Sequence, residues 1–203
     1  MKIALLSSAS SIHTVRWANG LSVAGHIVHV ITQQPIIESF NPNVKVHIFP
    51  NFGILGYFTM TSAVKKLLHN LKPDILNAHY ASGYGTTARL VDFHPYLLSV
   101  WGSDVYHFPY ISPLHKYLLQ KNLYAADAIA STSYCMAEQT KSLVNHRPNI
   151  YITPFGVDLE KFRPINVKKP FDDAAIIIGT VKTLSEKYGI EYLIRAFKIV
   201  SEK

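Results

Sequence analysis

The chain has 203 residues, of which 48% are hydrophobic and 16% charged, so it carries enough apolar side chains for one ordinary core and part of a second. This composition excludes a disordered or collagen-like chain. Lysine and arginine outnumber aspartate and glutamate by 20 to 13, and the formal charge of +7 favours anionic partners such as nucleotide phosphates, nucleic acids or acidic lipid headgroups.

The distribution of these residues argues against a nucleic-acid binder and against a membrane span. Basic residues are scattered, with Lys65-Lys66 and Lys168-Lys169 as the doublets, and there is neither an arginine-rich run nor an aromatic RNA-binding motif. No run approaches the roughly 18 apolar residues of a spanning helix, and the chain turns polar at Ser7, too early for a signal peptide. We therefore expect a cytoplasmic chain. The single Cys135 excludes an internal disulfide and a multi-cysteine zinc site.

Strand-like and helix-like patterns alternate along the chain, beginning with a strand at residues 3–6, a helix at 13–24 and a strand at 26–32. Gly25 should end this first helix, because a residue without Cβ tolerates the left-handed cap conformation. Further strands are expected at residues 44–49, 75–78, 96–100, 128–131 and 150–153, and helices at 62–70, 83–91, 113–122 and 135–144. The alternation predicts an α/β, Rossmann-like fold with about seven parallel strands and helices on both faces.

The composition changes at Pro154, where prolines, a glycine and charged residues follow one another without a clean period. We interpret residues 154–173 as an interdomain linker that follows a first domain at residues 1–153. Residues 174–179 are then expected to form a new strand, and residues 189–203 a new helix. One strand and one helix cannot bury their own apolar faces, so residues 174–203 are interpreted as the truncated start of a second domain.

In open parallel sheets, ligands bind beyond the carboxyl ends of the strands, so the residues that follow each strand are the candidates for chemistry. The first such loop is mainly hydroxylic and runs through Ser10 and Ser11 to His13. Unpaired amides at the start of the following helix suit an anionic group. The equally weighted alternative is that one serine merely caps the helix. A G-x-G-x-x-G motif is absent, which argues against a dinucleotide site.

Two other strand ends carry candidate residues. His79 follows a predicted strand, and an imidazole there could hydrogen-bond a sugar hydroxyl near a reacting centre, although a histidine at a strand end is more often structural. Gly102 permits close backbone approach after the next strand, and Asp104 can either cap the following turn or accept hydrogen bonds from substrate hydroxyls. No histidine pair has a metal-ligand spacing with carboxylates alongside, so no metal site is expected.

Several short motifs, each weak alone, follow one another in an order that resembles a known family. They are His79 after a strand, Trp101-Gly102-Ser103-Asp104, Ala126-Asp127-Ala128 followed by Ser133, residues 152–158 with Phe162 and Pro164, and residues 178–190. Together they resemble the N-terminal domain of a family 4 (group 1) glycosyltransferase of GT-B fold, followed by the first strand, loop and helix of the donor-binding domain. The resemblance covers nearly the whole chain.

This resemblance implies a retaining transfer of a sugar from a nucleotide diphosphate donor, UDP- or GDP-linked, to a saccharide or lipid-linked acceptor, without a cofactor or a required metal. It implies that His79 is the catalytic residue near the transferred sugar and that Lys182 and Lys187 contact the donor diphosphate. The acceptor side of the cleft would be lined by Ser10, Ser11, His13, Gly102, Ser103 and Asp104. Polysaccharide or glycolipid assembly in the cytoplasm, with peripheral contact at the inner face of the membrane, would be a natural role.

The sequence departs from the family pattern at several places. Ser10 and Ser11 replace the paired glycines of the first loop, and Phe155 stands where an asparagine is usual. Lys182 keeps the charge of the usual arginine but lacks the planar fork that binds two oxygens at once. The donor domain's pair of glutamates would lie beyond Lys203. We therefore expect the 203-residue chain to be inactive by itself.

A second hypothesis is a non-catalytic domain that binds a partner or a membrane surface. Its support is an apolar and aromatic segment at residues 49–60, followed by the doublet Lys65-Lys66. In a family member the same segment could hold a lipid-linked acceptor. The third alternative is that residues 49–60 pack beneath their loop as a small satellite of the core.

Overall fold

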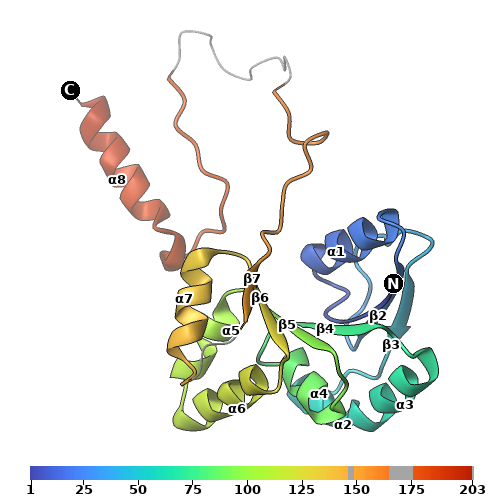
Figure 1. Ribbon diagram of the computed structural model, residues 1–203. Coiled ribbons are helices and arrows are strands. Elements are labelled where there is room, and N and C mark those ends of the chain that lie inside the picture. The colour runs from blue at the N-terminus through green and yellow to red at the C-terminus, as the bar shows by residue number, and fades with distance from the viewer. Residues whose placement is uncertain (146–148, 165–175, 203) are drawn as a thin grey trace. The chain divides into compact units, whose positions relative to one another are not determined.

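The computed structural model describes residues 1–145, 149–164 and 176–202, which fall into two compact units, Met1–Gly156 and Val157–Lys203. The first unit is built on a seven-stranded sheet in the order β3-β2-β1-β4-β5-β6-β7, and all neighbouring strands are parallel (Figure 1). The strands are β1 (Lys2–Leu6), β2 (Ile27–Thr32), β3 (Lys45–Ile48), β4 (Ile75–His79), β5 (Tyr96–Val100), β6 (Ala128–Ser131) and β7 (Ile150–Ile152). The prediction of an α/β, Rossmann-like sheet of about seven strands is confirmed.

Helices cover both faces of this sheet, as predicted. In Figure 1, α1 lies on one face and α2, α3, α4 and α6 lie on the other. The helical segments of the first unit are α1 (Ile12–Val23), η1 (Gly53–Leu55), α2 (Gly56–Thr59), α3 (Thr61–Leu71), α4 (Tyr84–Val91), α5 (Ser103–Tyr106), η2 (Phe108–Tyr110), α6 (Pro113–Tyr124) and α7 (Tyr134–Ser142). Gly25 follows the end of α1 with φ +85°, the conformation expected of it.

The core is split by the sheet into two clusters because successive side chains of a strand point to opposite faces. In β1, Ala4 and Leu6 pack in the larger cluster with residues of α3, α4 and α6, whereas Ile3 and Leu5 pack in the smaller cluster with Ala18 of α1. Both faces of β1 are therefore covered, which is why this strand is apolar throughout.

The segment at residues 49–60 has some side chains packed as a satellite of the core and others exposed as a binding surface would have them, so each of these two alternatives describes part of it. Met60 is buried, and Phe49 and Tyr57 pack partly buried against the larger core cluster, as a satellite of the core would. Four other apolar side chains of this segment are exposed to solvent: Phe52, Ile54, Leu55 and Phe58. No helix within the described ranges is both long and apolar enough to cross a bilayer.

The second unit contains the predicted helix but not the predicted strand. Helix α8 (Ile190–Ser201) follows a short turn, η3 (Glu186–Tyr188). Residues 176–185 form neither helix nor strand, so the prediction of a strand at 174–179 is wrong over its described part. A strand needs a neighbouring strand to pair its amides, and residues 176–202 contain none. Residues 174 and 175 and most of the predicted linker, residues 165–173, lie outside the described residues.

No residue of α8 is buried, although the helix carries Leu193, Ile194 and Phe197. Such an apolar stripe normally packs against a sheet or another helix. The domain boundaries proposed at residues 153 and 173 stay predictions.

A pair of histidines, His29 buried and His47 partly buried, joins β2 to the edge strand β3. Nδ1 of His29 lies 2.9 Å from Nε2 of His47, and the two rings are nearly parallel. Burial lowers the pKa of both imidazoles. The neighbouring His47 ring lowers the pKa of His29 further, and the charge of Lys45 lowers the pKa of both histidines. The fold therefore disfavours protonation of both side chains, and at least one ring must be neutral because one nitrogen of the pair accepts the hydrogen bond.

The free energy of unfolding should decrease as the pH falls through about 6.5 and below. In the unfolded chain both histidines have the ordinary pKa of 6.5 and bind protons below that pH, whereas in the folded chain their pKa values are lower. The contribution of the histidine pair to stability is therefore complete above pH 6.5 and is lost in acid. Urea unfolding between pH 7.5 and 5 measures the slope. The double variant His29→Leu/His47→Leu should have a shallower slope, whereas His69→Leu, on the exposed surface of α3, should leave it unchanged. An unaltered slope in the double variant would contradict this origin.

Candidate functional site

The carboxyl ends of β1, β4 and β5 bring three loops together, as the parallel topology requires. Nδ1 of His79, the last residue of β4, lies 3.0 Å from the Ser7 hydroxyl, which follows β1. The ring of Trp101, which follows β5, lies 4.7 Å from the ring of His79 and 5.8 Å from that of His13. Residues predicted from three separate strand ends are thus neighbours.

Both ring nitrogens of His79 are occupied by protein partners. Nε2 lies 2.8 Å from Oδ1 of Asn77, and the amide nitrogen of Asn77 donates to the carbonyl of Leu97 and to Ser99. Because Oδ1 can only accept, Nε2 of His79 carries the proton and Nδ1 accepts from Ser7. The Ser7 hydroxyl also lies 2.7 Å from that of Thr14. A chain of hydrogen bonds therefore runs from α1 through β1 and β4 to β5.

His79 is neutral at physiological pH, because its complete burial lowers its pKa to about 3. Its side chain is 1% exposed. A neutral imidazole can exchange hydrogen bonds but carries no charge. This geometry matches the structural alternative for a strand-end histidine; contact with a sugar would require one nitrogen to leave Ser7 or Asn77.

An aromatic cluster covers this part of the sheet edge. The ring of His13 stacks on that of Phe155 at 3.8 Å, and both rings meet the ring of Trp101 edge-on. Nδ1 of His13 is buried without a hydrogen-bond partner, and burial followed by the charge of Arg16 lowers its pKa. Phe155, which replaces the family's usual asparagine, thus adds an apolar surface beside His13.

The serine loop does not act as a conventional helix cap. Ser11 occupies the N-cap position of α1, but its side chain accepts no hydrogen bond from the first turn. The hydroxyl of Ser10 lies 2.8 Å from that of Ser8. Both Ser10 and Ser11 are partly exposed, so their hydroxyls and the amides at the start of α1 lie at the surface of the site.

Asp104 organises two loops from a fully buried position. Its carboxylate accepts hydrogen bonds from the amides of Ala81 at 2.8 Å, Gly102 at 2.8 Å and Trp101 at 3.1 Å. Burial raises the pKa of this carboxyl, and the three amide donors oppose the rise. The structure thus shows the turn-capping alternative for Asp104, whose oxygens are engaged by backbone amides.

The two residues before Asp104 differ in what they contribute. Gly102 has φ +141°, a conformation that residues with a side chain rarely adopt, although a Cβ there would meet open space. A glycine is needed at position 102 for the backbone conformation of the turn, and not to allow a close contact within this chain. Ser103 is exposed, and its hydroxyl is hydrogen-bonded to that of Tyr80.

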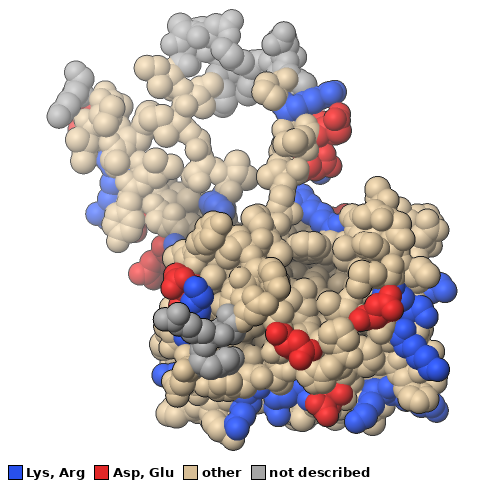
Figure 2. Space-filling model, in the orientation of Figure 1, with Lys and Arg blue, Asp and Glu red and all other residues tan. Residues whose placement is uncertain are grey.

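The two lysines predicted to contact a diphosphate lie together in the second unit. The ammonium of Lys182 lies 5.3 Å from the ring centroid of Tyr188, and that of Lys187 lies 5.6 Å from the same centroid. Both lysines are exposed. Elsewhere, the face drawn in Figure 2 shows Lys and Arg side chains spread over the surface without one dominant patch.

The sequence analysis missed the polar partners that hold His79, namely Ser7, Thr14 and Asn77. The role of Asn77 could have been predicted from the sequence, because an amide side chain in the middle of a buried strand must find hydrogen-bond partners. The pairing of Ser7 with Thr14 was not visible, since it depends on how α1 packs against β1. Within the described ranges, no three His, Cys, Asp or Glu side chains are grouped so that they could hold a metal ion.

Comparison with known proteins bears on this arrangement. The family described as Glycosyl transferase 4-like matches residues 2–133. TuaC of Bacillus subtilis (strain 168), which is named as a teichuronic acid biosynthesis glycosyltransferase, is 28% identical over 109 residues, 51% of this chain and 28% of that protein.

Among solved structures, sucrose-phosphate synthase from Thermosynechococcus elongatus aligns with a TM-score of 0.67 at 15% identity, over 81% of this chain and 50% of that one. Anabaena Alr3699/HepE in complex with UDP-glucose aligns with a TM-score of 0.57 at 13% identity, over 82% of this chain and 47% of that one. At such identities the likeness concerns the fold alone. The chain spans about half the length of these structures.

The family match covers more than half of the chain, including the loops that carry His79 and Asp104. It agrees with the resemblance drawn from the order of the motifs and with the likeness in fold to the aligned structures. The chain therefore belongs to the glycosyl transferase 4-like family and has the Rossmann-like fold of GT-B glycosyltransferases.

Proposed function

We propose that this chain forms the acceptor side of a glycosyltransferase that moves a sugar from a UDP- or GDP-linked donor to a saccharide or lipid-linked acceptor. The bond between the anomeric carbon and the diphosphate oxygen breaks, the acceptor hydroxyl oxygen bonds to that carbon, and the hydroxyl proton is released. The observation that carries the proposal is the family match over residues 2–133. The solved complex of HepE with UDP-glucose supports a nucleotide-sugar donor.

Retention of configuration at the anomeric carbon, without a cofactor or a required metal, belongs to the proposal because the family motifs imply it. Lys182 and Lys187 would then supply positive charge to the donor diphosphate, and their common position at Tyr188 supports a joint role. His79 is the proposed catalytic residue, and the partly exposed Ser10, Ser11 and His13 are proposed to face the acceptor. We place the protein in the cytoplasm, with peripheral contact at the inner face of a membrane.

Titration calorimetry with UDP, GDP and their sugar derivatives tests the proposal. The 203-residue chain should bind none of them tightly, whereas a chain that continues past Lys203 through a complete donor-binding domain should bind one nucleotide and thereby identify the base. In that longer chain, Lys182→Ala/Lys187→Ala should weaken nucleotide binding at least tenfold, because two charge-assisted contacts to phosphate are lost.

The control for this titration is Lys161→Ala, a change of an exposed lysine outside the predicted donor contacts, which should leave nucleotide affinity unchanged. Tight nucleotide binding by the 203-residue chain itself would overturn the assignment of the first unit to the acceptor. Absence of nucleotide binding by the longer chain would instead favour the non-catalytic, partner-binding alternative.

A further inference from the structure

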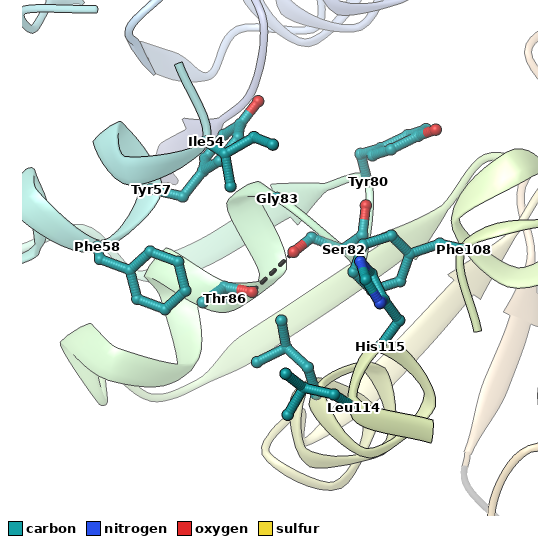
Figure 3. A pocket seen from close by; sticks show the side chains of 11 residues that line it. Ile54, Tyr57, Phe58, Tyr80, Ser82, Gly83, Thr86, Phe108, Leu114 and His115 are labelled. Carbon is teal, nitrogen blue, oxygen red and sulfur yellow. Dashed lines mark hydrogen bonds between the residues drawn. The ribbon is translucent and has the colours of Figure 1, made fainter. Parts of the chain in front are cut away.

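A pocket of about 330 Å³ opens within the first unit, between the α2 region and α6 (Figure 3). This volume lies in the range of small-molecule sites. The wall is mostly hydrocarbon, and its larger apolar side chains are Ile54, Tyr57, Phe58, Phe108, Leu114 and Leu118. A Cβ at Gly83 would lie 2.8 Å from the ring of Tyr57, so the glycine lets this ring form one wall.

Three apolar side chains of the pocket wall are exposed to solvent. Ile54 is 78% exposed, Leu114 is 72% exposed and Phe58 is 43% exposed. They come from opposite sides of the pocket, as Figure 3 shows for Ile54 and Leu114. A ligand that covered all three would remove apolar surface from water, which is the main source of affinity for a hydrocarbon.

Polar groups of the wall connect the pocket to the candidate site. Tyr80, which follows His79 directly, lines the pocket and shares a hydrogen bond with Ser103, one of the predicted acceptor residues. His115, another wall residue, has its Nδ1 2.8 Å from the Ser112 hydroxyl. A ligand with an apolar tail in the pocket would therefore have its polar part near the loop that carries Ser103.

Two of the three segments that form the pocket carry basic residues and no acidic ones. Residues 39–73 and 105–126 contain no aspartate or glutamate. They contain six lysines, which are Lys45, Lys65, Lys66, Lys72, Lys116 and Lys121. None of these lysines lines the pocket, but Lys116 directly follows the wall residue His115, and the net positive charge of the two segments complements an amphiphile with an anionic head.

We propose that this pocket binds the hydrocarbon chain of a phosphate-bearing lipid, with the phosphate toward Tyr80 and Ser103. The apolar wall favours a hydrocarbon chain, and the net positive charge of two of the segments that form the pocket favours an anionic head. This inference rests on the proposed function in one respect, because it makes the acceptor of the sugar a lipid-linked one. The binding of the lipid itself needs no sugar transfer.

A series of alkyl phosphates tests the inference on the 203-residue chain. Calorimetric titration with hexyl, octyl, decyl and dodecyl phosphate, each below its micellar concentration, should show affinity rising by up to about fourfold per added methylene. The rise should stop when the pocket is filled. Decanol and inorganic phosphate should each bind at least tenfold more weakly than decyl phosphate, because each lacks one half of the ligand.

Two exposed wall residues provide variants that should still fold. Ile54→Gln/Leu114→Gln should weaken decyl phosphate binding at least tenfold at an unchanged melting temperature. The matched control is Leu55→Gln, because Leu55 is 68% exposed next to Ile54 but does not line the pocket. The control should bind decyl phosphate as the unaltered chain does.

Affinity that does not depend on chain length, or an equal loss in Leu55→Gln, would overturn the lipid assignment. A dimer in sedimentation that is lost in Ile54→Gln/Leu114→Gln would assign this surface to a second copy of the chain and would also overturn it. Failure of the proposed function is distinguishable: the longer chain would then bind no nucleotide, while the alkyl phosphate series would still show its dependence on chain length.

Discussion

Replacement of Asp104 by alanine should lower the free energy of unfolding by about 3 to 5 kcal/mol. The carboxylate is fully buried and accepts hydrogen bonds from the amides of Ala81, Trp101 and Gly102. Alanine removes the acceptor and leaves three donors unpaired, and an unsatisfied buried group costs about 1 to 3 kcal/mol. Entry of water into the space would recover part of this cost. Urea unfolding monitored by circular dichroism measures the change.

Two further variants separate this effect from a general effect of removing charge. Asp104→Asn keeps one acceptor oxygen and should lose less stability than Asp104→Ala. Glu138→Ala breaks only an exposed ion pair with Lys141 and should change the free energy of unfolding by less than about 1 kcal/mol. A loss in Asp104→Ala as small as that in Glu138→Ala would show that the three amides find other partners.

Replacement of His79 by alanine should lower the free energy of unfolding by about 2 to 4 kcal/mol. The imidazole is buried and joins Ser7 to Asn77, so its removal leaves a cavity and two unpaired polar groups. His79→Phe fills the space but breaks the same hydrogen bonds, and it should lose about 1 to 3 kcal/mol. Thermal and urea unfolding compare the two variants.

Sugar transfer by a longer chain with a complete donor domain separates a catalytic from a purely structural His79. At a temperature where His79→Ala is folded, kcat should fall at unchanged nucleotide affinity if the imidazole contacts the sugar. Full activity in the folded variant would refute the catalytic assignment. The control His107→Ala changes an exposed histidine and should alter neither stability nor kcat. We expect no titration of His79 in the pH profile between 5 and 8, because burial lowers its pKa to about 3.

Local patterns predicted most of the first unit well because they report on local physics. The strands at Tyr96–Val100 and Ala128–Ser131 have their predicted bounds, and the other five strands differ from theirs by one or two residues. Continuous apolar runs identify strands that are buried on both faces, and Gly25 marks a helix end through its own backbone freedom. The strand expected at residues 174–179 is wrong over its described part, residues 176–179, because pairing requires a neighbouring strand and no local pattern supplies one.

The sequence by itself determined the α/β class, the order of strands and helices, and the strand ends where His79, Gly102 and Asp104 lie. Only the tertiary structure decided what these side chains do. In the folded chain His79 is buried between Ser7 and Asn77, and Asp104 accepts hydrogen bonds from three backbone amides. Phe155 stacks on His13, and Ile54 and Leu114 are both exposed in the wall of one pocket. The physical reason is that hydrogen bonds and burial at the sheet edge join residues up to 142 positions apart, as in the stack of His13 on Phe155, and no periodicity within a segment encodes such a contact.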